Sequence, residues 1–158
     1  MHRLLHLARR FLESLRSRPL DPIEQDQIAE WLHAGEADLF WEQQRIDRRH
    51  AYEAAAAVSR ARPERLDLVR AALLHDVGKR HSALRIPGRV AASLLSLAHL
   101  PTAGRYRAYL DHGTLGSADL AERGAEPIVV AFAAAHQGPP PESADPSDWA
   151  ILRAADGE

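Results

Sequence analysis

Residues 73–79 read Leu-Leu-His-Asp-Val-Gly-Lys, an apolar run that closes on two side chains able to bind divalent metal ions. The stretch from about 63 to 76 is rich in leucine, valine and alanine, which predicts a buried helix that the glycine ends. Taken alone, His75 and Asp76 could equally mark a helix C-terminus at which a histidine interacts with the helix dipole. Their meaning therefore depends on what the rest of the chain brings near them.

The lysine that closes this run, Lys79, is the only lysine in a chain whose other fixed side-chain cations are arginines. An ammonium is a compact point charge that binds phosphate, and an arginine does not replace it in every site. We expect Lys79 to contact a phosphate group, and a solvated loop cation is the alternative. Further candidates for phosphate contact or base stacking are Arg80, Arg85, Arg89, Arg105, Arg107, Tyr106 and Tyr109.

Four histidines and two aspartates stand within or at the end of predicted helices, each beside small or apolar residues: His50, His75, Asp76, His112, His136 and Asp156. Small residues such as Gly113 and Gly116 let helices approach closely, so that short ligand side chains can converge. The chain contains no cysteine, which excludes disulfides and thiolate zinc sites. A metal site must therefore use nitrogen and oxygen donors, which suit iron, manganese, magnesium, or catalytic zinc, cobalt or nickel.

Composition narrows the class of protein. The chain has 158 residues, of which 46% are hydrophobic and 27% charged, and this favours one globular domain with a real core. The formal net charge of −2, without a charged tail, argues against a stable complex with nucleic acid. The apolar run 128–135 is far too short to span a bilayer, and the N-terminus does not resemble a signal peptide. We expect a cytoplasmic protein, and a homodimer stays open.

Helical periodicity, prolines and glycines divide almost the whole chain into helices, with no strand alternation. Asp21-Pro22 predicts an N-cap followed by the first helical residue. A polar, basic loop is expected at 77–86. The predicted helices cover about 4–18, 22–32, 36–61, 63–76, 87–100, 104–112, 114–123, 127–136 and 146–156. The fold class is therefore all-α, a compact irregular bundle of about seven to nine helices.

The ordered set His … His-Asp … His … His … Asp resembles the HD-domain superfamily of metal-dependent phosphohydrolases, and residues 75–79 match its HD-[IV]-G-K form. The resemblance covers roughly residues 40–158, so that 1–40 is expected to be a helical extension packed on the metal-binding domain at 41–158. It implies two divalent ions, with iron or manganese favoured. His50, His75, Asp76 and Asp156 would hold the first ion. The second would be held by His112, His136 and the same aspartate, Asp76, as a bridge.

The resemblance also implies an activity. A hydroxide bridging the two ions would attack a phosphomonoester or phosphodiester, most simply that of a small phosphorylated substrate such as a nucleotide. Asp76 and Lys79 would be the catalytic residues, and Lys79, Arg80 and Arg105 would bind the substrate. The Gly-Tyr-Pro signature of the related cyclic di-GMP phosphodiesterases does not occur in this chain, which argues against that specific activity.

Two other functions stay open at this point. Some HD-domain relatives are mixed-valent di-iron oxygenases that use the same six ligands. A non-catalytic regulatory module that binds a nucleotide is the third interpretation. Individual ligands also have ordinary alternatives: without His112 or His136 the site would hold one ion, and Asp156 could be a solvated carboxylate close to the C-terminus.

Overall fold

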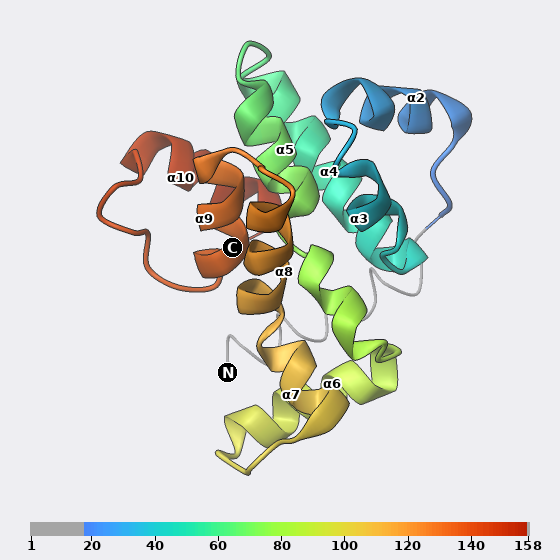
Figure 1. The fold of residues 1–158 in the computed structure, drawn as a ribbon, viewed down its shortest axis with the longest axis vertical. Coiled ribbons are helices and arrows are strands. Elements are labelled where there is room, and N and C mark those ends of the chain that lie inside the picture. The colour runs from blue at the N-terminus through green and yellow to red at the C-terminus, as the bar shows by residue number, and fades with distance from the viewer. Residues whose placement is uncertain (1–17, 158) are drawn as a thin grey trace.

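The computed structural model describes residues 18–157, and every regular element within them is helical (Figure 1). These elements are α2 (Pro22–Trp31), α3 (Ala37–Trp41), α4 (Arg45–Ala61), α5 (Leu66–Leu74), η1 (Val77–Ser82), α6 (Ile86–Leu97), α7 (Gly104–Leu110), α8 (His112–Glu122), α9 (Pro127–Ala135) and α10 (Pro146–Asp156). The all-α prediction is confirmed. The helix predicted at 4–18 lies almost entirely outside the described residues. Among the helices that are described, none has both the length and the apolar character needed to cross a bilayer.

Two predicted boundaries were wrong. The stretch 36–61 contains no proline and only one flanking glycine, yet it forms two helices that break at 42–44. At this break the buried side chain of Gln43 turns back to donate to the Phe40 carbonyl. The expected polar loop at 77–86 is instead a 3₁₀ helix, η1, over most of its length. Most of η1 is buried, because its cations pair with carboxylates of the protein and not with solvent.

The predicted start of α2 is confirmed in atomic detail. The Asp21 side chain accepts from the Glu24 N–H at 2.9 Å, and the Glu24 carboxylate accepts from the Asp21 N–H at 2.8 Å, which is a capping box. Arg49 of α4, itself buried, donates to both Glu24 oxygens and to the carbonyls of Arg18 and Pro19. The hydrogen bonds from Arg49 lower the pKa of Glu24 to about 2. This pair locks the first described helix onto α4.

The hydrophobic core is centred on α5, which packs against α4 on one side and α9 on the other (Figure 1). All residues from Leu68 to Leu74 are buried, as the apolar sequence predicted. Ile28, Leu39 and Phe40 belong to the same core. The ring centroids of Phe132 in α9 and Trp149 in α10 lie 5.2 Å apart in an edge-on arrangement, and this contact brings α10 into the core.

Glycines allow η1, α8 and α9 to approach until their backbones touch. A Cβ on Gly78 would lie 1.9 Å from the carbonyl oxygen of His112 and 2.6 Å from the amide nitrogen of Gly116. A Cβ on Gly113 would lie 2.9 Å from the carbonyl oxygen of Ala133. The expectation that small residues bring these helices together is confirmed.

Helices α6 and α7 form a hairpin that projects from the rest of the molecule (Figure 1). Ala92 is its only buried residue, and Leu94, Leu97 and Leu100 are all exposed. Polar contacts therefore hold this hairpin against the rest of the molecule more than apolar packing does.

Candidate metal centre

All six predicted ligands lie together where five helices and the start of η1 meet. His75 and His136 directly follow the last residues of α5 and α9, and His112 begins α8. Five of the six are buried, whereas the His50 side chain is 30% exposed. Ligand atoms within 4.8 Å of one another form three groups: His50, His75 and Asp76; His75, His136 and Asp156; and Asp76, His112 and His136. The structure thus contains several groups that could hold metal ions.

One side of the cluster is built on Asp156. Its Oδ1 lies 2.7 Å from Nε2 of His50 and 3.2 Å from Nε2 of His75. The same His75 nitrogen is 3.4 Å from Oδ2 of Asp76. The predicted alternative for Asp156, a solvated terminal carboxylate, is wrong, because the side chain is only 3% exposed and faces two histidines.

The other side of the cluster uses the second oxygen of Asp76. Oδ1 lies 3.4 Å from Nε2 of His112 and 3.7 Å from Nε2 of His136, while Oδ2 faces His75 and Lys79. Two donors that each stand about 2.1 Å from a common ion are roughly 3.0–3.5 Å apart, close to these separations. The two oxygens therefore point toward different histidine groups, as a bridging carboxylate requires.

Each of the three buried histidines is oriented by a backbone carbonyl three residues earlier. Nδ1 lies 2.8 Å from the Ala72 oxygen in His75, 2.7 Å from the Tyr109 oxygen in His112, and 3.1 Å from the Ala133 oxygen in His136. A carbonyl only accepts, so Nδ1 carries the proton and donates. In the neutral ring this leaves the lone pair on Nε2, toward the cluster.

Three atoms at the middle of the cluster are buried without a hydrogen-bond partner: Nε2 of His75, Oδ1 of Asp76 and Nε2 of His112. Leaving a buried polar atom unsatisfied typically costs about 1–3 kcal/mol, so such atoms call for an explanation. A divalent ion would satisfy all three, since neutral imidazole nitrogens and carboxylate oxygens are suitable donors. The residues present therefore fit a metal ion.

The electrostatics of the cluster favour one bound proton when no ion is present. Burial opposes a charge on His75, but the carboxylates of Asp76 and Asp156 outweigh it and raise the pKa of His75 to about 10. Burial likewise opposes ionisation of Asp76, yet Lys79 and His75 hold its pKa well below the usual range. For His136, burial and the nearby His75 cation lower the pKa to about 4.

These shifts predict that ion binding is strongly pH-dependent. Below pH 10 an ion must displace the proton of His75, so affinity should rise about tenfold per pH unit from pH 6 to 9 and one proton should be released. His136 is already neutral throughout this range and contributes no slope. Calorimetric titration with Mn²⁺ in buffers of different ionisation enthalpy measures this proton. The proton release should disappear in His75→Ala, and an affinity equal at pH 6 and pH 8 contradicts the prediction.

Lys79 is part of this cluster. Its side chain is only 7% exposed and its ammonium donates to Oδ2 of Asp76. The alternative of a solvated loop cation is therefore wrong. Whether Lys79 also contacts a phosphate stays a prediction.

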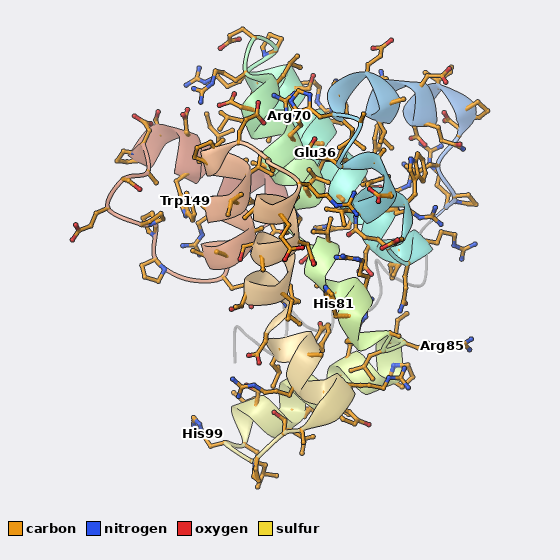
Figure 2. The ribbon with its side chains drawn as sticks, in the orientation of Figure 1. Glu36, Arg70, His81, Arg85, His99 and Trp149 are labelled. Carbon is orange, nitrogen blue, oxygen red and sulfur yellow. The ribbon has the colours of Figure 1, made fainter. Side chains whose placement is uncertain are left out.

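The other predicted substrate-binding cations are engaged elsewhere. Arg80 donates to Asp119 at 2.7 Å and to Glu42 at 3.0 Å. Arg105 donates to the Ser82 carbonyl at 2.9 Å, at the end of η1. These bonds tie η1 to α8 and α7, so both guanidinium groups are engaged by protein groups outside the metal cluster. Figure 2 also shows Arg85 and His99 pointing outward, away from the centre of the molecule.

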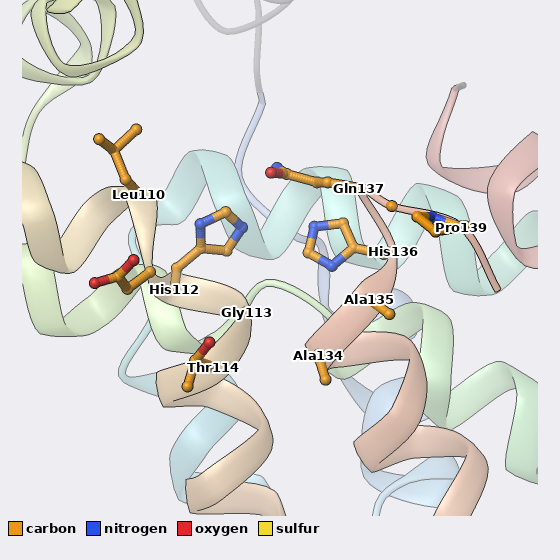
Figure 3. A pocket seen from close by; sticks show the side chains of 11 residues that line it. Leu110, His112, Gly113, Thr114, Ala134, Ala135, His136, Gln137 and Pro139 are labelled. Atoms are coloured by element: carbon orange, nitrogen blue, oxygen red, sulfur yellow. The ribbon is translucent and has the colours of Figure 1, made fainter. Parts of the chain in front are cut away.

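A cavity of about 320 Å³ opens beside the second side of the cluster. Figure 3 shows the rings of His112 and His136 facing each other across it, from α8 and α9. Thr114 and Gln137 add polar groups to its wall, and neither was singled out from the sequence. The position of Gln137 directly after His136 in the sequence could have pointed to it. No lysine or arginine is among the residues that line this cavity.

Comparison of the chain with family models, curated proteins and solved structures found no match. The resemblance to the HD-domain superfamily thus rests on the six residues and the 75–79 motif alone.

Proposed function

We propose that this protein is a metal-dependent phosphohydrolase that acts on a small phosphorylated substrate such as a nucleotide. The observation that carries the proposal is the buried set of unpartnered donor atoms around Asp76, whose two oxygens face two groups of histidines. Four imidazoles and two carboxylates make a site for two divalent ions, for which we favour iron or manganese. The HD-type order of these residues supports phosphate ester hydrolysis as the reaction.

The HD-type order implies how the ligands divide between the two ions. His50, His75 and Asp156 would hold one ion, His112 and His136 the other, and Asp76 both, although His136 also lies within ligand distance of His75 and Asp156. When bound, such a pair of ions lowers the pKa of a water molecule and offsets the charge of phosphoryl oxygens. The chain's own part is to keep the Nε2 atoms of His75, His112 and His136 turned inward and to exclude bulk water from five of the six ligands.

Lys79 supplies the charge that binds and stabilises the phosphate in this proposal. Its ammonium already lies at Oδ2 of Asp76 and is buried, where an electrostatic interaction is stronger than in water. Turning from the carboxylate to a phosphoryl oxygen is a small movement for its flexible stem, and it would offset charge that develops during the reaction.

The cavity beside His112 and His136 would hold the leaving group. With the Asp111 carboxylate and no lysine or arginine in its wall it does not suit phosphate, whereas Thr114, Gln137 and the apolar lining residues suit an uncharged group with hydrogen-bonding edges. Its volume is at the lower end of the roughly 300–1,000 Å³ that ligand pockets span. A single nucleoside or a group of similar size therefore fits better than a large second nucleotide.

The test is phosphate release from a panel of nucleoside mono-, di- and triphosphates and cyclic nucleotides, with Mn²⁺, Fe²⁺ or Co²⁺ added. We expect release with at least one ion, and its retention in Asp119→Asn, which removes an α8 carboxylate outside the cluster. Oxygen uptake should be recorded in parallel. Oxygen consumption without phosphate release would contradict the proposal in favour of an oxygenase, and neither activity with any ion would favour a regulatory module.

A further inference from the structure

Among the three histidines held by carbonyls, His112 is held differently. His75 and His136 each use a carbonyl of the helix that they cap, Ala72 in α5 and Ala133 in α9. His112 begins α8, but its acceptor is Tyr109 in the last turn of α7. The orientation of this ring therefore depends on where the projecting α6–α7 hairpin lies.

A buried arginine fixes that hairpin to the body. Arg89 of α6 donates to both carboxylate oxygens of Asp47 in α4, each at 2.6 Å, and to the Leu84 carbonyl at 2.9 Å. The Arg89 side chain is only 12% exposed and that of Asp47 only 7%. Paired, planar hydrogen bonds of this kind define both distance and angle, which a lysine cannot reproduce. All three oxygen atoms to which Arg89 donates belong to the protein, so Arg89 serves structure better than phosphate binding.

The ring of Tyr109 lies between the Arg89 guanidinium and His112 and contacts both. The guanidinium lies over the Tyr109 ring, 5.7 Å from its centre, and this ring stacks on His112 with centroids 5.8 Å apart and planes at 28°. A continuous set of contacts thus runs from Asp47 through Arg89 and Tyr109 to His112.

We propose that Arg89 and Asp47 are positioning residues that set the tautomer and direction of His112, and through it the affinity of the ion that His112 holds. This inference rests on the proposed function for the presence of that ion, but the state of the histidine ring can be measured without it. We expect the effect on the His112 side of the cluster, because the contacts from the hairpin run through Tyr109 to His112 and not to His50, His75 or Asp156.

The experiment compares Arg89→Lys with Arg70→Lys. Arg70 makes a matched pair, since it is buried and donates through two nitrogens to Glu126. Figure 2 places it at the end of the molecule opposite the hairpin. Long-range ¹H–¹⁵N spectra of the histidine rings, assigned with His112→Gln, report the tautomer. Titration with Mn²⁺ alone reports affinity, and His112→Ala and His50→Ala identify which binding step belongs to each side.

In Arg89→Lys we expect the His112 signal to move from the Nδ1–H form toward a mixture of tautomers. The affinity of the His112 step should fall about 10- to 100-fold, as for other groups that orient metal ligands, with less than a threefold change in the His50 step. Arg70→Lys should lower the melting temperature without either effect. If Arg89→Lys does not fold, Asp47→Asn carries the same expectation.

An unchanged His112 tautomer in Arg89→Lys, or equal weakening of both binding steps, would overturn the inference. If His112→Ala leaves Mn²⁺ binding unaltered, the second ion of the proposed function is wrong. The spectra of the metal-free protein then still decide whether Arg89 positions the ring.

Discussion

Asp76→Asn is expected to abolish binding at both sides of the metal centre. An amide has the shape of the carboxylate but only one oxygen, and its NH₂ group offers no lone pair to a metal ion on the other side. It also leaves the buried Lys79 ammonium without its anion. We expect Mn²⁺ affinity to fall at least about 100-fold and phosphate release at least about 1,000-fold, which corresponds to roughly 4 kcal/mol of transition-state stabilisation.

Thermal unfolding with and without Mn²⁺ measures the binding loss independently of activity. At a hundred times its dissociation constant, an ion stabilises the native protein by about 2.7 kcal/mol, or roughly 5–10 °C for a domain of this size. The native protein should show this shift and Asp76→Asn should show none. Asp119→Asn is the matched control, because Asp119, like Asp76, accepts from a cation of η1, here Arg80, yet lies outside the cluster. A full Mn²⁺ shift in Asp76→Asn would remove Asp76 from the ligand set.

Gly78→Ala is expected to be the most destabilising small change in the described chain. The added methyl would lie 1.9 Å from the His112 oxygen and 2.6 Å from the Gly116 nitrogen, both backbone atoms of α8 that cannot rotate away. Overpacking usually costs about 1–3 kcal/mol when side chains can adjust. Because a whole helix must move here, we expect a loss of at least about 3 kcal/mol, or roughly 6–12 °C in melting temperature.

The same change should weaken the His112 side of the centre, because the clashing carbonyl belongs to His112 itself. Gly35→Ala is the control, since its Cβ would meet nothing closer than the Arg123 oxygen at 3.7 Å. It should alter the free energy of unfolding by less than about 1 kcal/mol. Denaturant titration of both variants gives the comparison. Equal stability of the two, with Mn²⁺ binding intact in Gly78→Ala, would show that η1 and α8 tolerate separation.

Local signals in the sequence were enough for most of the fold. The capping box at Asp21 and the apolar run before His75 depend on neighbours in the chain, so the helices that they begin and end were predicted correctly. Nothing in 36–61 marks a helix break, because the cause is the burial of Gln43, and burial is set by the fold. The basic residues after Asp76 indicated a loop for a similar reason: their partner Asp119 is 39 residues beyond Arg80.

The clustering of the six residues could be predicted from the sequence because five of them stand at or next to a helix end, and such ends meet in a compact bundle, whereas His50 lies inside α4. The supporting contacts were not accessible. Arg89 was a candidate phosphate contact, with an ordinary surface arginine as the alternative, but it pairs with Asp47, 42 residues earlier, a relation that no local pattern encodes. Likewise, the acceptors of the three ring N–H groups are carbonyls, which every residue has.

Because backbone carbonyls orient the three histidines, the sequence around the cluster can change in evolution without turning the rings. At 72 and 133 the orienting group is the backbone, so ligand direction places no demand on the side chains there, and evolution is free to replace them as packing allows. At 109 the backbone also serves, but the Tyr109 ring is itself a contact of His112 and Arg89. Relatives of this chain should therefore vary at the first two positions only within what core packing allows, while keeping an aromatic ring at the third. The sequence around the cluster would thus diverge before the six residues of the cluster change.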